Sequence, residues 1–167
     1  VPSDRWKPQD FYDPNGSPGS VAENKTYSKI GGFVRDFEFD WRRWRIPPGS
    51  LPQIDVTQLW AVAVSASALE HAGYGEGGKE LNRALTGVVF ANAVGGENRD
   101  MGTLHVHVDQ AIRYAQEGGM TDTKSFREKW TEGLPKVDED TMPGELANVI
   151  AGRVANLLDL QGPNYTT

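Results

Sequence analysis

The chain closes with Leu158-Asp159-Leu160-Gln161-Gly162-Pro163-Asn164-Tyr165-Thr166-Thr167, where a helix end, a turn and a strand follow one another. Gly162 and Pro163 favour a turn, and the residues after them predict a strand that begins near Asn164. Before the turn, a helix is predicted over residues 145–158, and Pro143 suits its first turn. The broad apolar face of this helix consists of Leu146, Val149, Ile150, Val154, Leu157 and Leu158. A helix that leads through a turn into a strand is a common unit of α/β domains.

A second strand is predicted over residues 86–94, a continuous apolar run rich in β-branched residues. Such a run is typical of a central strand that is buried on both faces. Gly95 and Gly96 end it with a turn. This pair lacks the glycine spacing and the lysine of a phosphate-binding loop, so the end of a strand is the preferred interpretation.

Two more helices are predicted before and after this strand. Residues 55–72 carry one apolar stripe, Asp55 and Gln58 resemble a capping box, and Gly73 supplies the stop. Residues 101–116 form the other helix, which Gly118 and Gly119 end, and a polar loop leads on to Pro143. The order helix, strand, helix, helix, strand predicts a layered α/β domain.

The first 29 residues are rich in Pro, Gly, Asp, Asn and Ser, a composition that buries too little apolar surface to fold alone. We expect an extended surface segment anchored by Trp6, Phe11 and Tyr12, whose rings are costly to leave in water. A disordered linker is the alternative.

The composition narrows the function classes. The chain has 167 residues, enough for one domain with a real core, and 17 basic against 23 acidic residues give a net charge of −6. That charge argues against a general nucleic-acid binder. With no cysteine, these residues hold no disulfide, no Cys-based zinc site and no thiolate nucleophile. No stretch predicts a membrane span or a signal peptide, so a cytoplasmic protein is expected.

Five stretches resemble, in the same order, segments of the β-ketoacyl synthases, the condensing enzymes of polyketide and fatty acid synthesis. They are residues 1–6 with 11–14, residues 27–33 with 39–40, residues 54–59 with 68–74, residues 142–144 with 147–148 and 151–153, and residues 158–167. In the third stretch, Val56 and Thr57 depart from the family's usual Asp-Pro-x-Gln. Residues 42–48 are more similar to polyunsaturated-fatty-acid or enediyne-type synthases than to ordinary modular ones.

The resemblance implies the amino-terminal half of a thiolase-like, layered α-β-α-β-α domain, with residues 1–52 as an extended linker-like segment and 53–167 in the core. It implies part of a β-ketoacyl synthase that performs decarboxylative Claisen condensation of acyl and malonyl thioesters. The nucleophilic cysteine is expected just after Thr167 in an Asp-x-x-Cys motif, and the two histidines in the other half, so no catalytic side chain is assigned here. A non-catalytic partner, either a chain-length factor or a scaffold, is the alternative.

The resemblance also places candidate residues for the acyl tunnel and the dimer. In the family, the turn at Gly95, Gly96 and Glu97 borders the tunnel. Thr141 and Met142 fall where a residue reaches into the partner's tunnel, although a plain helix start is an equal alternative. The strand at Asn164, Tyr165 and Thr166 pairs with its copy across a two-fold axis. The implied partners are the rest of the domain, a second copy and an acyl carrier protein with phosphopantetheine-linked substrates, without a bound cofactor.

Two other motifs each allow a functional and a purely structural interpretation. His105-x-His107-x-Asp109 resembles part of the signature of metallo-β-lactamase-like hydrolases, but residues two apart on a helix point about 200° apart and cannot share an ion. Residues 41–45, Trp-Arg-Arg-Trp-Arg, could hold a phosphate or contact an acidic carrier protein. A solvated surface turn is the favoured interpretation of that stretch.

Overall fold

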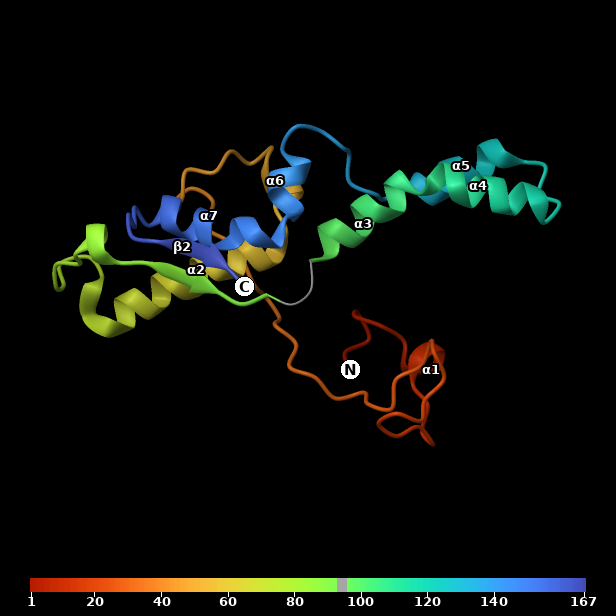
Figure 1. The fold of residues 1–167 in the computed structure, drawn as a ribbon, viewed down its shortest axis with the longest axis horizontal. Coiled ribbons are helices and arrows are strands. Elements are labelled where there is room, and N and C mark those ends of the chain that lie inside the picture. The colour runs from red at the N-terminus through yellow and green to blue at the C-terminus, as the bar shows by residue number, and fades with distance from the viewer. Residues whose placement is uncertain (93–95) are drawn as a thin grey trace. The chain divides into compact units, whose positions relative to one another are not determined.

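The computed structural model describes residues 1–92 and 96–167, which form two units, Val1–Glu38 and Phe39–Thr167. The units divide between Glu38 and Phe39, whereas the sequence predicted a linker-like segment that runs to residue 52. Figure 1 identifies the elements of both units. Among the described residues, no helix has the length and apolar character needed to cross a bilayer.

The first unit is an extended segment with one short helix, α1 (Pro8–Phe11). Its aromatic side chains make contacts within the segment, as expected. The rings of Trp6 and Phe11 meet edge to face at 6.1 Å, and Lys29 Nζ lies 4.7 Å from the centre of the Tyr12 ring. The assignment of residues 1–52 to one extended, linker-like segment stays a prediction.

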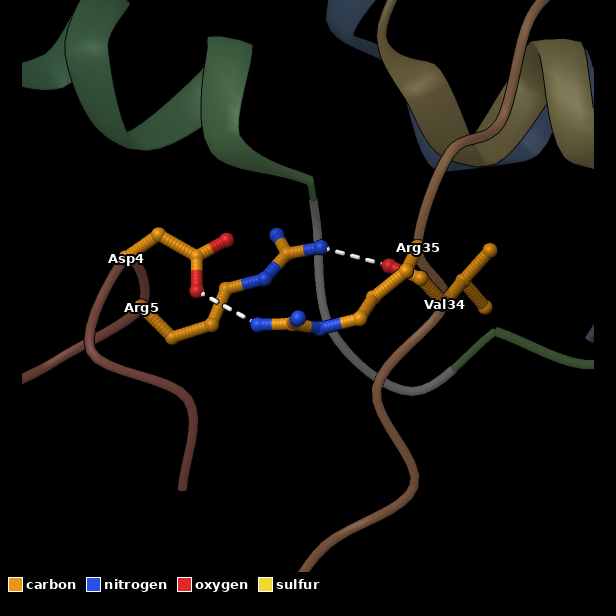
Figure 2. A network of polar contacts seen from close by, with 4 residues as sticks. All are labelled: Asp4, Arg5, Val34 and Arg35. Carbon is orange, nitrogen blue, oxygen red and sulfur yellow. Dashed lines mark hydrogen bonds and ion pairs between the residues drawn. The ribbon is translucent and has the colours of Figure 1, made fainter.

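Two arginines join the beginning and the end of the first unit, as Figure 2 shows. Arg5 donates a hydrogen bond to the backbone carbonyl of Val34 at 2.6 Å. Arg35 pairs with the carboxylate of Asp4 at 2.8 Å. All four residues are exposed, and contacts of this kind stabilise a fold by about 0–1 kcal/mol each.

Helix α2 (Val56–Leu69) confirms the helix predicted over residues 55–72. Asp55 caps its first turn by accepting a hydrogen bond from the amide of Thr57 at 2.8 Å. The helix continues into a wider turn, Glu70–Tyr74, where Gly73 adopts φ +88° and ends it as predicted. The capping box was wrong in one respect. Gln58 does not return to the cap, because its amide is engaged by the carbonyls of a distant segment.

Strands β1 (Val88–Phe90) and β2 (Asn164–Thr166) pair in parallel, with Val88 opposite Asn164 and Phe90 opposite Thr166. The two predicted strands therefore lie side by side in one sheet. The predicted strand over residues 86–94 was too long within the described residues, and Val94 lies outside them. Burial on both faces was also wrong for this chain, since the side chain of Val89 is 58% exposed. Helix α7 packs against both strands, and neighbouring Val88 is buried in the core.

The core of the second unit lies between α2, α7 (Ile150–Leu157) and the two strands. Its buried side chains are Ala61, Val62, Val88, Ile150, Ala151, Val154, Ala155 and Leu160. The single helix predicted over residues 145–158 was wrong at its start. The chain forms a short helix α6 (Thr141–Glu145), an extended residue Leu146, a 3-10 turn Ala147–Val149, and only then α7.

The first three helices that the structure describes after β1 all differ from the prediction. The helix predicted over residues 101–116 is broken at His107 into α3 (Glu97–Val106) and α4 (Val108–Glu117). The polar loop predicted after Gly119 was wrong, since it contains α5 (Thr123–Thr131), which packs beside α4 as a hairpin (Figure 1). Phe126 and Trp130, one turn apart on α5, stack at 5.4 Å and give this helix its apolar face.

Candidate functional site

The buried polar side chains gather at the amino-terminal end of α2. Among residues 1–92 and 96–167, the polar or charged residues that are buried are Gln53, Asp55 and Gln58, with Asp55 and Gln58 each only 1% exposed. A polar group removed from water is costly unless it is hydrogen-bonded. These three residues, named here the anchor cluster, should therefore be fully engaged, and they are.

Gln58 holds the segment around α6. Its amide nitrogen donates to three backbone carbonyls, those of Pro143 at 3.0 Å, Gly144 at 2.7 Å and Leu146 at 3.3 Å. Its carbonyl oxygen accepts a hydrogen bond from Nε of Arg153 on α7. One side chain of α2 thereby bonds to the end of α6 and to α7. The carbonyls that Gln58 engages lie where the chain leaves helical geometry at Leu146.

Arg153, on α7, is the residue that donates to the side-chain oxygen of Gln58. Burial lowers the pKa of its guanidinium from the ordinary value, and the negative charge of Asp140 opposes that shift. The group remains a cation because the starting value is so high. Its second contact is to the carbonyl of Pro143 at 3.5 Å, which Gln58 also engages. The α6 segment is thus held by donors from two helices.

Asp55 connects the starts of two helices. One carboxylate oxygen accepts from the amide and the hydroxyl of Thr57, at 2.8 and 2.6 Å. The other accepts from the amide of Asn98, in the first turn of α3, at 3.0 Å. The amino ends of both helices carry partial positive charge, which favours a carboxylate between them. Asn98 also donates from its side chain to the carbonyl of Pro52 at 3.1 Å.

Gln53 fixes the start of α6. Its amide nitrogen donates to the carbonyl of Lys136 at 2.8 Å and to the carboxylate of Asp138 at 3.2 Å. Its carbonyl oxygen accepts from the hydroxyl of Thr141 at 3.2 Å. The same hydroxyl accepts from the amide of Asp138 at 2.9 Å. Thr141 therefore faces the anchor cluster.

Two glycines allow the backbone to approach the anchor cluster closely. A Cβ atom added at Gly144 would lie 1.8 Å from the backbone oxygen of Gln53, and one at Gly96 would lie 1.9 Å from the carboxylate of Asp55. Contacts this short are impossible for any side chain. The amide of Asp55 also donates to the carbonyl of Gly144 at 2.9 Å, so the two chain segments are in direct backbone contact.

The structure brings part of the predicted tunnel set together at this end of α2. Gly96 precedes α3, and Glu97 is its first residue. Thr141 and Met142 are the first two residues of α6, and the side chain of Met142 is 57% exposed. Gly95 lies outside the described residues. The two turns, about 45 positions apart in the sequence, are both held by the anchor cluster.

The three candidate dimer residues lie elsewhere, on β2. Asn164 and Tyr165 are exposed, while Thr166 is partly buried against α7. The hydroxyl of Thr166 accepts from the amide of Ala151 at 3.3 Å and donates to the carbonyl of Asn148 at 3.4 Å. This strand therefore meets the helix start of α7 rather than α6.

A mostly apolar hollow of about 220 Å³ opens beside the anchor cluster. It lies between the first half of α2, the end of β1 and the start of α7. Its walls are Thr57, Trp60, Ala61, Val64, Phe90, Ala91, Asn92 and Ile150. Walls of this composition suit an aliphatic chain rather than a charged ligand.

The basic stretch 41–45 forms a surface turn, as the favoured interpretation predicted. Arg42 and Arg43 lie over the rings of Trp41 and Trp44, and Arg43 pairs with Glu70 at 2.6 Å. The turn borders an open groove of about 880 Å³ whose charged walls are Arg43, Arg45, Arg83, Glu70, Glu76 and Asp159. Because both signs of charge are present, the groove is not a concentrated site for phosphate.

The histidine motif takes no part in the anchor cluster. Asp109 is paired with Arg127 of α5, and Nδ1 of His107 lies 3.1 Å from the side-chain oxygen of Gln110. In the part of the chain that the structure describes, no group of three or more His, Cys, Asp or Glu side chains is placed to hold a metal ion.

The role of Gln53 was not predicted from the sequence, and the predicted role of Gln58 was wrong. The available signal was the run Gln53-x-Asp55-x-x-Gln58, three polar residues at the start of a helix whose other inward positions are apolar. The spacing of Asp55 and Gln58 predicts a local cap, and no nearby residue pattern indicates the distant carbonyls to which Gln58 bonds.

The chain belongs to the β-ketoacyl synthase family, since the model of the β-ketoacyl synthase N-terminal domain matches residues 1–167. The resemblance drawn from the motifs is thereby confirmed, and the helices and parallel strand pair are consistent with the α/β class expected for it.

Curated relatives match over almost the whole chain. One component of a polyunsaturated fatty acid synthase from Thraustochytrium sp. is 27% identical over 98% of this chain and 6% of its own length. A PKS-NRPS hybrid synthetase from Aspergillus niger is 30% identical over 99% of this chain and 7% of its own length. A phenolphthiocerol synthesis polyketide synthase type I from Mycobacterium marinum is 32% identical, over 97% and 6%. The chain thus corresponds to a small part of very long synthases.

Proposed function

We propose that this chain is the amino-terminal half of a thiolase-like, layered α-β-α-β-α domain that catalyses decarboxylative condensation of acyl and malonyl thioesters. The observation that carries the proposal is the family match over residues 1–167. The parallel pairing of β1 with β2 supports the layered fold, because both strands belong to one half-sheet in that architecture. We also propose that the protein acts in the cytoplasm.

The proposed reaction has two steps. A cysteine thiolate, expected just after Thr167, attacks the acyl thioester of a carrier protein, takes the acyl group and releases the carrier thiol. A malonyl thioester then loses carbon dioxide, and the resulting enolate carbon attacks the cysteine-bound acyl carbonyl. The new carbon–carbon bond forms as the cysteine thiolate leaves. Two histidines and backbone amides of the remaining half stabilise the charged oxygens.

This chain supplies the wall of the acyl tunnel in the proposed enzyme. Gly95, Gly96 and Glu97 border it, and Thr141 and Met142 contribute the far end of the tunnel in the second copy. The apolar hollow beside α2 has walls that suit an aliphatic chain, but these walls are formed by other residues of α2, β1 and α7, so the five tunnel residues are assigned from the family resemblance. Met142 is the stronger tunnel candidate of the pair, since its side chain is 57% exposed while the Thr141 hydroxyl is bonded to Gln53.

The proposed partners are the rest of the domain, a second copy and an acyl carrier protein with phosphopantetheine-linked substrates. Exposed apolar side chains on α2, β1 and β2, namely Val64, Val89 and Tyr165, support further coverage of these faces. We assign the free edge of β2, with Asn164, Tyr165 and Thr166, to pairing with its copy across a two-fold axis. Contacts of that kind repeat the same residues on both sides.

The test is a condensation assay on the complete domain that contains this chain. Incubation with an acyl thioester is expected to leave one acyl group on the cysteine after Thr167, and malonyl thioester to convert it into a β-ketoacyl product. A Cys→Ala variant at that cysteine should lose both signals. A domain without that cysteine, or one that is never acylated, would instead support the chain-length factor or scaffold. The relatives named above do not favour this alternative, since each is named a synthase or synthetase.

A further inference from the structure

The anchor cluster lies where two expected tunnel segments meet. Asp55 bonds to the amide of Asn98, two residues after Gly96, while Gln53 and Gln58 bond to α6, which begins with Thr141 and Met142. Helix α6 has only five residues, so its position depends on contacts with α2 more than on its own helical structure. The 96–97 turn begins helix α3, and Asp55 bonds to the amide of Asn98 in the first turn of that helix.

The hydrogen bonds of Gln58 and the close approaches at two glycines also restrict how the held segments can move. Each polar atom of Gln58 is engaged, and the donor faces three carbonyls that belong to one short turn. A buried amide with several partners has few alternative arrangements that keep all of them bonded. The close approaches at Gly96 and Gly144 leave no space for a shift toward α2. The segments are held from the cluster side, while the side chain of Met142 remains exposed on the other.

We infer that Gln58 and Asp55 are positioning residues for acyl-chain selection: buried in the anchor cluster, they set where the 96–97 turn and Met142 stand along the tunnel. The inference rests on the proposed function. Gln58 acts on α6, and Asp55 acts on the start of α3. Neither side chain touches the substrate, because both are buried beneath the segments they hold.

A displaced α6 is expected to affect long and short acyl chains differently. A short chain does not reach the far end of the tunnel, so a displaced α6 leaves its turnover unchanged. A long chain must pass the displaced segment, and a misplacement of about 1 Å can cost on the order of 100-fold in rate. A purely structural role would instead reduce the amount of folded enzyme and lower both activities by the same factor.

The test uses the complete domain with Gln58→Met, which keeps the side-chain length and removes the amide. We expect the ratio of kcat/KM for a long over a short acyl thioester to fall by at least about tenfold. The matched control is Gln116→Met, at an exposed glutamine on α4, which should leave the ratio unchanged. Within α6, the Gln53 side chain bonds to Thr141. Gln53→Met removes this bond and is a milder variant in case Gln58→Met fails to fold.

A second measurement does not depend on activity. Amide hydrogen exchange over residues 141–146 should become faster in Gln58→Met than in the unsubstituted domain and in Gln116→Met. A ratio that stays constant, or exchange that stays slow, would overturn the positioning role. If the unsubstituted domain does not condense at all, the proposed function falls with the tunnel assignment, while the exchange data still decide whether Gln58 holds α6.

Discussion

The two ends of α2 use polar side chains in opposite ways. At the amino-terminal end, Asp55 and Gln58 are buried, and they bond to α3, α6 and α7. At the carboxyl-terminal end, Glu70 pairs with Arg43 at 2.6 Å, and both side chains are about half exposed. One helix therefore has an end that is fixed by buried contacts and an end that borders an open groove.

The two ends of α2 differ because water reaches the polar side chains at the carboxyl-terminal end and not those at the amino-terminal end. A buried donor or acceptor that loses its partner costs about 1–3 kcal/mol, because nothing replaces the lost hydrogen bond. An exposed ion pair that is broken leaves two groups that water solvates, and such pairs contribute about 0–1 kcal/mol. The amino-terminal end should therefore be sensitive to single substitutions, and the carboxyl-terminal end should tolerate them. The following variants test that contrast in the complete domain.

The largest loss of stability is expected from Gly144→Ala. The added methyl group would lie 1.8 Å from the backbone oxygen of Gln53, so the backbone of α6 or of the segment before α2 must move. We expect the free energy of unfolding to fall by about 3 kcal/mol, as for an overpacked core. Gly49→Ala is the control, because its methyl group would meet no atom within 4 Å. Equal denaturation midpoints for the two variants would contradict the close approach.

A smaller loss is expected from Asp55→Ala, which removes the acceptor for both Thr57 and Asn98. Loss of a helix cap and of a second charge-assisted hydrogen bond should lower the free energy of unfolding by about 2 kcal/mol. The matched control is Asp122→Ala, the exposed cap of α5 with a single bond to the amide of Ser125. That control should cost about 1 kcal/mol or less. Similar losses in urea denaturation would show that Asp55 is only a local cap.

The smallest effect is expected at the other end of α2. A double-mutant cycle with Arg43→Ala and Glu70→Ala should give a coupling free energy of no more than about 0.5 kcal/mol, since both side chains are half exposed. The coupling should weaken further in high salt. A coupling as large as the loss caused by Asp55→Ala would erase the contrast between the two ends.

The sequence predicted the parts of the fold that depend on local pattern. The apolar stripe and Gly73 gave α2 and its end, and the apolar run beside Gly87 gave the strand that pairs with β2. Helix α5 was missed because its apolar face rests on two aromatic residues, Phe126 and Trp130, within an otherwise polar stretch.

The anchor cluster could be predicted only in part, for a different reason. Asp55 was recognised as a cap from its position, which is a local property. The partners of Gln58 lie 85 to 95 residues further along the chain, and no local pattern connects a glutamine to carbonyls at that separation. For the same reason, the break between α6 and α7 was not foreseen, since it depends on carbonyls that a distant side chain engages.

The anchoring role of α2 is tested most directly by amide hydrogen exchange in the unsubstituted complete domain. Three amides report on the amino-terminal end, those of Asp55, Thr57 and Asn98, which bond to Gly144 or to the Asp55 carboxylate. The amide of Lys79, bonded to the carbonyl of Gly73, reports on the other end. We predict that the first three exchange much more slowly than Lys79 and open together. Fast exchange at Asn98 or Asp55, comparable with that at Lys79, would contradict the account.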